Sequence, residues 1–224
     1  MTDTVISMNN KILCWDEATE TDLPAEKTII FWWRQNVPAQ LDLALQKKYQ
    51  VVLCPRLPLY FDFVQDNAHL SGRRWNSMLF NTISDVYTFP DKFILPDKSG
   101  AAQVLGMQAN LWTETVASEK RLDFMIFPRM AALGEAAWTV SAKKDENSFN
   151  ERLKSNLLLY DKAGIYYYNP FDPSMHPEAI DFAPRIPKPA VKSKHHHHDK
   201  GASSGGHHKA ASSHKKHNTK KTSK

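Results

Sequence analysis

The sequence predicts an α/β protein built on a parallel β-sheet. Four short runs are nearly continuous in apolar residues rather than alternating, which is typical of strands covered on both faces. Between the second and third runs, Pro38–Tyr49 begins with proline and carries three leucines, a pattern that predicts a helix. Strand, helix and strand in this order form a βαβ unit, whose strands pair in parallel through a right-handed crossover. The predicted strands are Lys11–Trp15, Thr28–Trp33, Gln50–Cys54 and Gln103–Gln108, the last continuing towards Trp112.

Two further helices are predicted after the fourth strand. Pro128–Trp138 begins with proline and is rich in alanine and glycine, which permit close approach to a sheet. Ser148–Lys162 has apolar residues at three- and four-residue spacing, and Gly164 fits a left-handed stop at its end. Residues 63–102 form a long connection, which in a compact domain is expected to be functional or to carry small elements of its own.

Composition divides the chain into a folded part, residues 1–183, and a basic tail, residues 184–224. The tail opens with a proline-basic linker and continues mainly with His, Lys, Ser, Ala, Thr and Gly. With almost no apolar side chains to offset chain entropy, it is expected to be disordered. Its histidines, four of them at His195–His198, could bind Zn²⁺ or Ni²⁺, although a solvated tail is the simpler interpretation.

The formal net charge of +5 is a property of this tail. Residues 192–224 carry nine lysines and one acidic residue, a net charge of +8, which leaves −3 on residues 1–191. The balance therefore predicts no nucleic-acid binding by the folded part. Neither a long apolar run that could span a membrane nor the basic and apolar regions of a signal peptide occur, and the localisation stays open.

The two cysteines, Cys14 and Cys54, each lie in an apolar run. Buried free thiols at strand ends are therefore expected, and a reactive role is the weaker interpretation. Such cysteines neither require nor exclude an oxidising compartment.

Tryptophans and carboxylates gather at the carboxyl ends of the predicted strands. In a (β/α) barrel these ends and the loops that follow form the ligand-binding rim. An indole there needs a partner for its N–H and offers a large flat contact, so core filling does not explain it. A sugar ring provides that contact through its C–H face, and carboxylates accept hydrogen bonds from its hydroxyls, so the rim predicts a carbohydrate ligand. The rim segments are Trp15-Asp16-Glu17, Trp32-Trp33, Tyr60-Phe61-Asp62 and Leu111-Trp112-Thr113-Glu114.

With their neighbours, these segments resemble the catalytic domain of family 20 glycoside hydrolases, the β-N-acetylhexosaminidases. Leu-Gly-Met-Gln-Ala-Asn-Leu-Trp-Thr-Glu at 105–114, followed by Phe-Pro-Arg-Met-Ala-Ala-Leu-Gly-Glu-Ala-Ala-Trp at 127–138, is similar to the signature that ends that domain. Cys14-Trp-Asp-Glu17, Phe31-Trp-Trp33 and Leu59-Tyr-Phe-Asp62 occur in the family's order, and the resemblance covers residues 8–168. It implies the C-terminal half, about strands 5–8, of a (β/α)8 TIM barrel.

The resemblance also implies which residues bind substrate. Three tryptophans would wall the pocket that holds the acetamido group of a terminal N-acetylhexosamine. The tyrosine would hydrogen-bond the acetamido carbonyl and so orient it. The aspartate and the glutamate would bind ring hydroxyls, the glutamate those at C4 and C6. The implied substrate-binding residues are Trp15, Trp33, Tyr60, Asp62, Trp112 and Glu114.

Other residues of these motifs receive structural interpretations. Adjacent strand residues point to opposite sides, so one of Trp32 and Trp33 faces the pocket, and the place in the motif favours Trp33. Arg129 and Glu135 belong to the signature but fall on a helix behind the sheet. The residues expected to serve packing or structure are Trp75, Trp138, Arg129 and Glu135.

Asp16-Glu17 is not interpreted as the family's catalytic pair. In the family's substrate-assisted reaction the 2-acetamido oxygen attacks the anomeric carbon, while an aspartate and a neighbouring glutamate supply the charge and the proton. That pair resembles Gly-Gly-Asp-Glu after the fourth strand, whereas Asp16-Glu17 follows Trp15 and matches the motif of the fifth strand. No Gly-Gly-Asp-Glu occurs in the chain, which begins about ten residues before the fifth strand, so no catalytic acid is assigned. No metal and no cofactor are implied.

Three interpretations stay open. The first is a fragment of an exo-acting β-N-acetylhexosaminidase for N-acetylhexosamine-terminated glycans, which in this family is usually secreted, periplasmic or lysosomal. Half a barrel leaves two unpaired sheet edges and one apolar face uncovered, so a separate N-terminal half or self-association would complete it. The second is an inactive N-acetylhexosamine-binding protein. The third is an interaction module that its cationic tail tethers to anionic polymers or surfaces.

Overall fold

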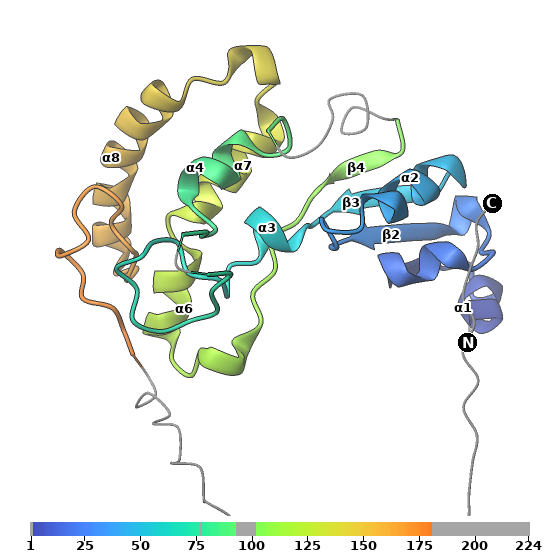
Figure 1. The fold of residues 1–224 in the computed structure, drawn as a ribbon, viewed down its shortest axis with the longest axis horizontal. Helices are drawn as coiled ribbons and strands as arrows, with labels where there is room; N and C mark the ends of the chain where they lie inside the picture. Colours follow the sequence, from blue (N-terminus) through green and yellow to red (C-terminus); the bar gives the residue numbers. More distant parts are fainter. Residues whose placement is uncertain (1, 77, 93–101, 181–224) are drawn as a thin grey trace, which may run out of the picture. The chain divides into compact units, whose positions relative to one another are not determined.

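The fold is organised around one four-stranded parallel sheet (Figure 1). The computed structural model describes residues 2–76, 78–92 and 102–180. The strands follow the order β1-β2-β3-β4, and every neighbouring pair is parallel, as the sequence predicts. Each begins or ends within a residue or so of its predicted bounds. They are β1 (Ile12–Trp15), β2 (Thr28–Trp32), β3 (Gln50–Leu53) and β4 (Val104–Met107).

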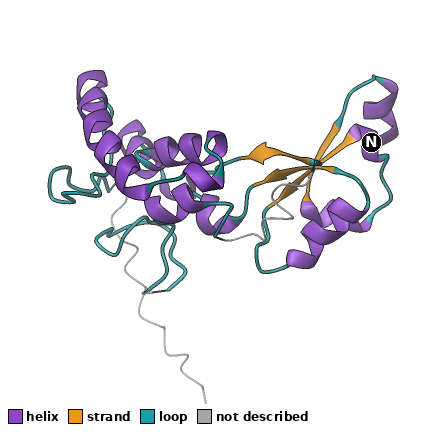
Figure 2. Cartoon of the chain, turned by 90° about the horizontal axis from the view of Figure 1, so that it is seen from above, coloured by secondary structure: helices purple, strands orange, loops and turns teal. Residues whose placement is uncertain are grey.

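The two faces of the sheet differ in burial. One face carries Ile30 and Val51, both fully buried. On the other face Leu13 is 61% exposed, and Leu105 of β4 is 52% exposed. Cover on both faces, which the continuous apolar runs suggest, is therefore not found at β1 and β4, and one apolar face lies open, as expected of four such strands alone. Figure 2 shows the strands fanned by the ordinary twist of a sheet.

Helices cover the buried face and build the rest of the core. The predicted crossover helix is α2, and the two predicted later helices are α7 and α8. Asp145 caps α8 by accepting a hydrogen bond from the Ser148 amide, and Gly164 ends it at φ 72°, as expected for a left-handed stop. Their bounds are α2 (Pro38–Gln46), α7 (Arg129–Trp138) and α8 (Glu146–Ala163).

Several short elements were not predicted. The long connection at 63–102 does carry a helix of its own, α4, which lies beside α7 (Figure 1). The sequences of the elements that were not predicted are too short for their apolar residues to show a helical period. These helices are α1 (Thr2–Ser7), α3 (Arg56–Leu59), α4 (Ile83–Thr88) and α6 (Glu119–Ile126), with 3₁₀ turns at Asp16–Glu20, Ala25–Lys27, Thr113–Thr115 and Ser141–Lys143.

Two tryptophans expected to pack behave differently. Trp75 stacks on Phe63 with ring centroids 4.5 Å apart, and its Nε1 donates to Asn81 Oδ1 at 2.8 Å, so it does pack. Trp138 is 92% exposed, and the expectation for it is wrong. Ala136 faces the core, and Trp138 lies two residues on, about 200° around the helix, so its indole points outward.

Both cysteines are free thiols. Cys54 is fully buried, as expected, and burial raises the pKa of its thiol to about 12, so it is an unreactive core residue. Cys14 is only partly buried, because it lies on the outer strand β1.

The predicted tail lies outside the described residues, and with it the boundary at 183/184, the expected disorder and the histidine-rich segment. Across the described ranges, the helices are too short or too polar to cross a membrane.

The buried guanidinium of Arg129 fastens the chain that follows β3. Its Nη2 donates to Phe61 O at 2.7 Å and its Nη1 to Phe63 O at 2.9 Å and Asn81 O at 3.0 Å. A further bond reaches Met125 O at 2.5 Å. Asn81 also holds this segment, because its Nδ2 donates to Tyr60 O at 2.8 Å. The expectation that Arg129 is structural agrees with its complete burial and with these backbone contacts.

Replacing Arg129 by Met should destabilise the protein by at least about 3 kcal/mol. The change leaves buried carbonyls without a donor, and each unsatisfied group costs about 1–3 kcal/mol. Urea unfolding followed by circular dichroism measures the loss. The control Arg152→Met removes an arginine whose side chain is 51% exposed, and should cost less than about 1 kcal/mol. Equal losses for the two variants would contradict the role given to Arg129.

His69 is buried in a cage made by Phe124 and Tyr168, with ring centroids 5.1 and 4.8 Å away. Neither ring nitrogen has a hydrogen-bond partner among the described residues. Burial, together with nearby Arg129, Arg121 and others, lowers the His69 pKa to about 3. The ring is therefore neutral at physiological pH.

This buried ring should make stability depend on pH. Because the folded-state pKa lies below the unfolded value of about 6.5, the stabilisation is complete above pH 6.5 and is lost as the pH falls towards 3. Between pH 7 and pH 5 the protein should lose about 2 kcal/mol that a His69→Phe variant keeps. Urea unfolding at both pH values measures this difference, and identical losses in both proteins would count against a neutral buried His69.

Candidate functional site

All six residues that the resemblance implies for substrate binding line one cavity of about 410 Å³. Each is placed by the end of a strand or by the loop that follows it. Trp15 ends β1 and Trp33 follows β2, while Tyr60 and Asp62 follow α3. The last two, Trp112 and Glu114, lie at the turn after β4. The size fits a small-molecule site.

Aromatic rings form the wall of this cavity. Trp112 lies 6.3 Å from Trp15 and 6.4 Å from Tyr60, measured between ring centroids. Trp33 stacks against Tyr60 at 6.4 Å with an interplanar angle of 25°. Trp15 and Trp112 are 39% and 44% exposed, so their faces are open to a ligand.

The choice between Trp32 and Trp33 follows the alternation of the strand. Trp32 is 3% exposed and belongs to the hydrophobic core, whereas Trp33 lines the cavity. This agrees with the preference for Trp33. The indole N–H of Trp33 donates to the Glu17 carboxylate at 3.2 Å, which fixes the plane of the ring.

Asp62 is a buried carboxylate beside the cavity, and its side chain is 1% exposed. Burial raises its pKa above the ordinary aspartate value, while its own backbone amide, the positive charge of Arg73 and the Trp112 amide oppose the rise. Arg73 Nε lies 3.0 Å from Asp62 Oδ2, but neither carboxylate oxygen has a well-directed hydrogen bond to a described residue. Asp62 therefore keeps acceptor capacity for a ligand hydroxyl.

Arg73 joins the two carboxylates of the cavity. Its Nη2 donates to Glu114 Oε1 at 2.9 Å while its Nε pairs with Asp62. The Glu114 side chain is 58% exposed and can turn towards a ligand. Tyr60 stays protonated and able to donate, because burial raises the pKa of its hydroxyl to about 12.

Asp16 is committed to the structure. It is fully buried; its Oδ1 accepts from Arg34 Nε at 2.7 Å and its Oδ2 from the amides of Trp33 and Arg34 at 3.3 and 3.2 Å. Burial raises its pKa despite these bonds. For Glu17, burial also acts to raise the pKa, but hydrogen bonds from its own amide and from Trp33, with the charge of Arg34, lower it overall. Asp16 thus joins β1 to the end of β2, and Glu17 orients Trp33.

Sequence reasoning missed three residues of the cavity and gave a fourth, Glu17 of the rim, no part in binding. Arg73 lies in the long connection, where no periodicity marks it, and Arg56 precedes the rim motif. The Arg56 guanidinium covers the Trp33 ring at 5.4 Å. Phe63 was hidden by its place one residue beyond the motif. The missed residues are Arg56, Phe63 and Arg73.

Two further groups of residues bear on the site. Glu135 lies outside the cavity lining and pairs with Arg152 of α8, in keeping with the structural role expected for it. Within the described part of the chain, no cluster of three or more His, Cys, Asp or Glu side chains could hold a metal ion.

The aromatic and acidic rim has its counterpart in a known family. The model of the catalytic domain of glycosyl hydrolase family 20 matches residues 1–141. The chain belongs to glycosyl hydrolase family 20. Members of this family are glycosidases of the β-N-acetylhexosaminidase type, and the resemblance stated from the sequence motifs is confirmed.

Curated family 20 relatives are longer than this chain. It is 27% identical over 158 residues to a β-N-acetylhexosaminidase of Cellulomonas fimi, which covers 70% of this chain and 31% of the relative. It is 29% identical over 164 residues to a β-hexosaminidase of Porphyromonas gingivalis, which covers 71% of this chain and 20% of the relative. The chain thus spans less than a third of the length of these relatives.

Solved family 20 structures share the fold. The exo-β-N-acetylglucosaminidase of Vibrio harveyi, solved in complex with N-acetylglucosamine, matches with a TM-score of 0.64 and 30% identity over 76% of this chain and 26% of that one. The β-N-acetylhexosaminidase of Streptomyces coelicolor matches with a TM-score of 0.67 and 24% identity over 77% and 35%. With the parallel sheet, these likenesses support the α/β class and relate the sheet to TIM-barrel catalytic domains.

Replacing Arg73 by Ala should raise the pKa of Asp62 further. The substitution removes the nearest positive charge, so the charged form of the Asp62 carboxyl becomes more costly to bury and the neutral form is favoured. As the pH rises to that pKa, this variant should lose more stability in total than the wild type, because its folded state keeps the Asp62 proton to a higher pH than the unfolded state does. Carbon NMR of the Asp62 carboxyl during a pH titration measures the shift. Lys154→Ala, remote on the surface of α8, should leave the Asp62 pKa unchanged, and an unchanged or lower value in Arg73→Ala would refute the prediction.

Proposed function

We propose that the cavity holds the terminal N-acetylhexosamine of a glycan, as the sugar-binding wall of a β-N-acetylhexosaminidase. The observation that carries the proposal is the convergence of three tryptophan rings, a protonated tyrosine and two carboxylates on one cavity. The family assignment supports it, and so does the N-acetylglucosamine bound in the similar Vibrio harveyi enzyme.

Each residue type has a distinct part in this proposal. Trp15, Trp33 and Trp112 wall the acetamido group and the apolar face of the sugar ring. The Tyr60 hydroxyl donates to the acetamido carbonyl and turns its oxygen towards the anomeric carbon. The acceptors Asp62 and Glu114 bind ring hydroxyls, Glu114 those at C4 and C6.

The proton donor of the family reaction comes from outside these 224 residues in this proposal. Substrate-assisted hydrolysis needs an acid at the leaving oxygen and a carboxylate beside the acetamido nitrogen. The sequence holds no Gly-Gly-Asp-Glu, and Asp16 is occupied by Arg34 and two backbone amides. Loss of the general acid by itself lowers the rate of hydrolysis by a factor of about 10²–10⁴. The chain by itself is therefore a binding wall without turnover.

In the same proposal the four strands are strands 5–8 of an eight-stranded barrel. Two features support it: β1 and β4 are the outer strands of the sheet, and Leu13 and Leu105 lie exposed on them. An N-terminal barrel half, on the same polypeptide or another, covers that face and pairs with both edges, and a second copy of this chain is the alternative partner.

An inactive N-acetylhexosamine-binding protein is the second candidate. The retained aromatic wall, in a sequence without the catalytic motif, favours it. The two candidates share the ligand and differ in whether a barrel half supplying the acid exists.

Sugar binding tests the proposal directly. Titration of the full chain with N-acetylglucosamine should change its tryptophan fluorescence, and Trp112→Ala should weaken binding at least about tenfold, because one ring of the wall is lost. Trp138→Ala is the matched control, since its indole is exposed and outside the cavity, and it should bind as the wild type does. No binding by the wild-type chain, or equal binding by Trp112→Ala, would overturn the proposal.

Hydrolysis tests the assignment of the acid. The purified chain should not release the chromophore from a chromogenic β-N-acetylglucosaminide. Turnover that disappears in Glu17→Gln, while N-acetylglucosamine still binds as in the wild type, would make Glu17 the proton donor and reverse the assignment of Asp16-Glu17. Turnover regained on adding an N-terminal barrel half would separate the enzyme part from the inactive binding protein.

A further inference from the structure

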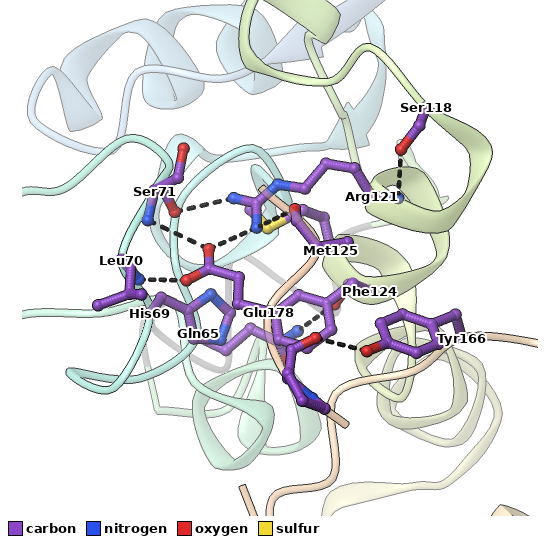
Figure 3. A network of polar contacts seen from close by, with 12 residues as sticks. Gln65, His69, Leu70, Ser71, Ser118, Arg121, Phe124, Met125, Tyr166 and Glu178 are labelled. Atoms are coloured by element: carbon purple, nitrogen blue, oxygen red, sulfur yellow. Dashed lines mark hydrogen bonds and ion pairs between the residues drawn. The ribbon is translucent and has the colours of Figure 1, made fainter. Parts of the chain in front are cut away.

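A buried ion pair lies outside the cavity and joins distant parts of the chain. Arg121 Nη1 of α6 lies 2.5 Å from Glu178 Oε1, and the two side chains are 1% and 6% exposed (Figure 3). Burying such a pair costs desolvation that offsets much of its attraction, so stability alone is a weak explanation for it. Its other contacts show what it holds.

Arg121 and Glu178 both form hydrogen bonds with the backbone of residues 70–71. The Glu178 carboxylate accepts hydrogen bonds from the amides of Leu70 and Ser71, the latter at 3.1 Å. Arg121 Nη2 donates to Ser71 O at 2.8 Å. Figure 3 shows Glu178 reaching Leu70 and Ser71 on one side and Arg121 on the other. The backbone at 70–71 is therefore fixed through both its donors and its acceptor.

The segment that carries Glu178 is itself tied down. The Tyr166 hydroxyl donates to Pro177 O at 2.5 Å, and the Tyr166 amide donates to Asp123 Oδ2 at 3.2 Å. Thus Glu178 is presented from a chain segment anchored on α6, although it lies more than one hundred residues from Leu70 in sequence.

Residues 70–71 are followed closely in sequence by a residue that lines the cavity. Gly72 follows Ser71 with φ +119°, and a Cβ there would lie 2.7 Å from Val64 Cγ1, so no side chain fits. The next residue is Arg73, whose amide donates to Asp62 O at 3.1 Å and whose carbonyl accepts from the Val64 amide at 3.0 Å. Its side chain then bridges Asp62 and Glu114.

We propose that the Arg121–Glu178 pair is a clamp that positions Arg73 between Asp62 and Glu114, and that Arg73 thereby fixes both carboxylates for the sugar. The proposal rests on the proposed sugar-binding function. Arg73 forms an ion pair with Asp62 and donates a hydrogen bond to one oxygen of Glu114, and the remaining acceptor capacity of both carboxylates serves ring hydroxyls. The C-terminal segment at 165–180 thus controls ligand affinity from outside the cavity.

The test separates positioning from stability by a double-mutant cycle on the full chain. Glu178→Gln removes the charge that pairs with Arg121, and Glu178→Asp keeps it on a shorter arm. Gly72→Ala places a Cβ 2.7 Å from Val64 Cγ1 and 3.3 Å from Arg121 Nη2, so it displaces the backbone before Arg73 while keeping both charges of the pair. Arg73→Ala removes the positioned group. Glu151→Gln, which breaks the exposed pair with Lys154 on α8, is the control. Dissociation constants for N-acetylglucosamine and unfolding midpoints are measured for each variant.

The clamp predicts one pattern of affinities. Glu178→Gln, Gly72→Ala and Arg73→Ala should each weaken binding about tenfold, the effect of one charge-assisted hydrogen bond, while Glu178→Asp recovers part of it. In the Arg73→Ala background, Glu178→Gln should cause no further loss of affinity, although it still lowers the unfolding midpoint. Losses of affinity that add fully, or wild-type affinity in Gly72→Ala and Glu178→Gln, would overturn the proposal.

Hydrogen exchange gives a readout that needs no ligand. In Glu178→Gln and Gly72→Ala the Arg73 amide should exchange faster than in the wild type, while Glu151→Gln leaves it unchanged. If the wild-type chain fails to bind sugar, the proposed function fails, and exchange at Arg73 alone decides whether the clamp exists. If sugar binds and exchange at Arg73 is unaltered in both variants, the clamp fails and the proposed function stands.

Discussion

The site depends first on one buried cation, the guanidinium of Arg129. It donates to the carbonyls of Phe61 and Phe63, the residues on either side of Asp62, and holds Asn81 O in the same grip. A loop rich in aromatic residues, with a buried carboxylate at its centre, has no regular hydrogen-bond ladder to define it. The N–H groups of the buried Arg129 guanidinium satisfy the backbone carbonyls in place of that ladder. Although burial lowers the Arg129 pKa to about 9, the side chain keeps its charge at neutral pH, and with it its donors.

The same solution recurs at the first two strand ends. Asp16 accepts from the amides of Trp33 and Arg34, so a buried anion fixes the end of β2 as a buried cation fixes the chain after β3. Asp16 lies outside the cavity while its neighbour Glu17 lines it, and Arg129 lies outside while Asp62, between two of the carbonyls that it holds, lines it. This division explains why a carboxylate next to the wall can be structural, and why the neighbouring Glu17 spends its hydrogen bonds on the Trp33 indole.

The sequence carried enough information for the strands, the two long later helices and the six rim residues. Each depends on a local signal: a continuous apolar run, a proline at a helix start, or a motif at a strand end. Arg73 and Glu178 could not be found this way. Their positions follow from contacts between segments far apart in the chain, Arg73 with Glu114 and Glu178 with Leu70, and no spacing within either segment encodes them. Trp138 misled for a related reason, because its apolar character said nothing about which side of α7 it occupies.

Trp15 belongs to two cavities at once. It stands in the aromatic wall, and it also borders a second, more apolar hollow with Leu13, Cys14, Phe31 and Gln108. The rear of a ligand-facing indole is thus accessible from the uncovered side of the sheet. Under the proposed function, a partner that binds on that side and shifts the ring would change the affinity of the cavity for the sugar. By thermodynamic reciprocity the sugar would then change the affinity for the partner by the same factor. Binding of the partner and binding of the sugar would therefore be coupled.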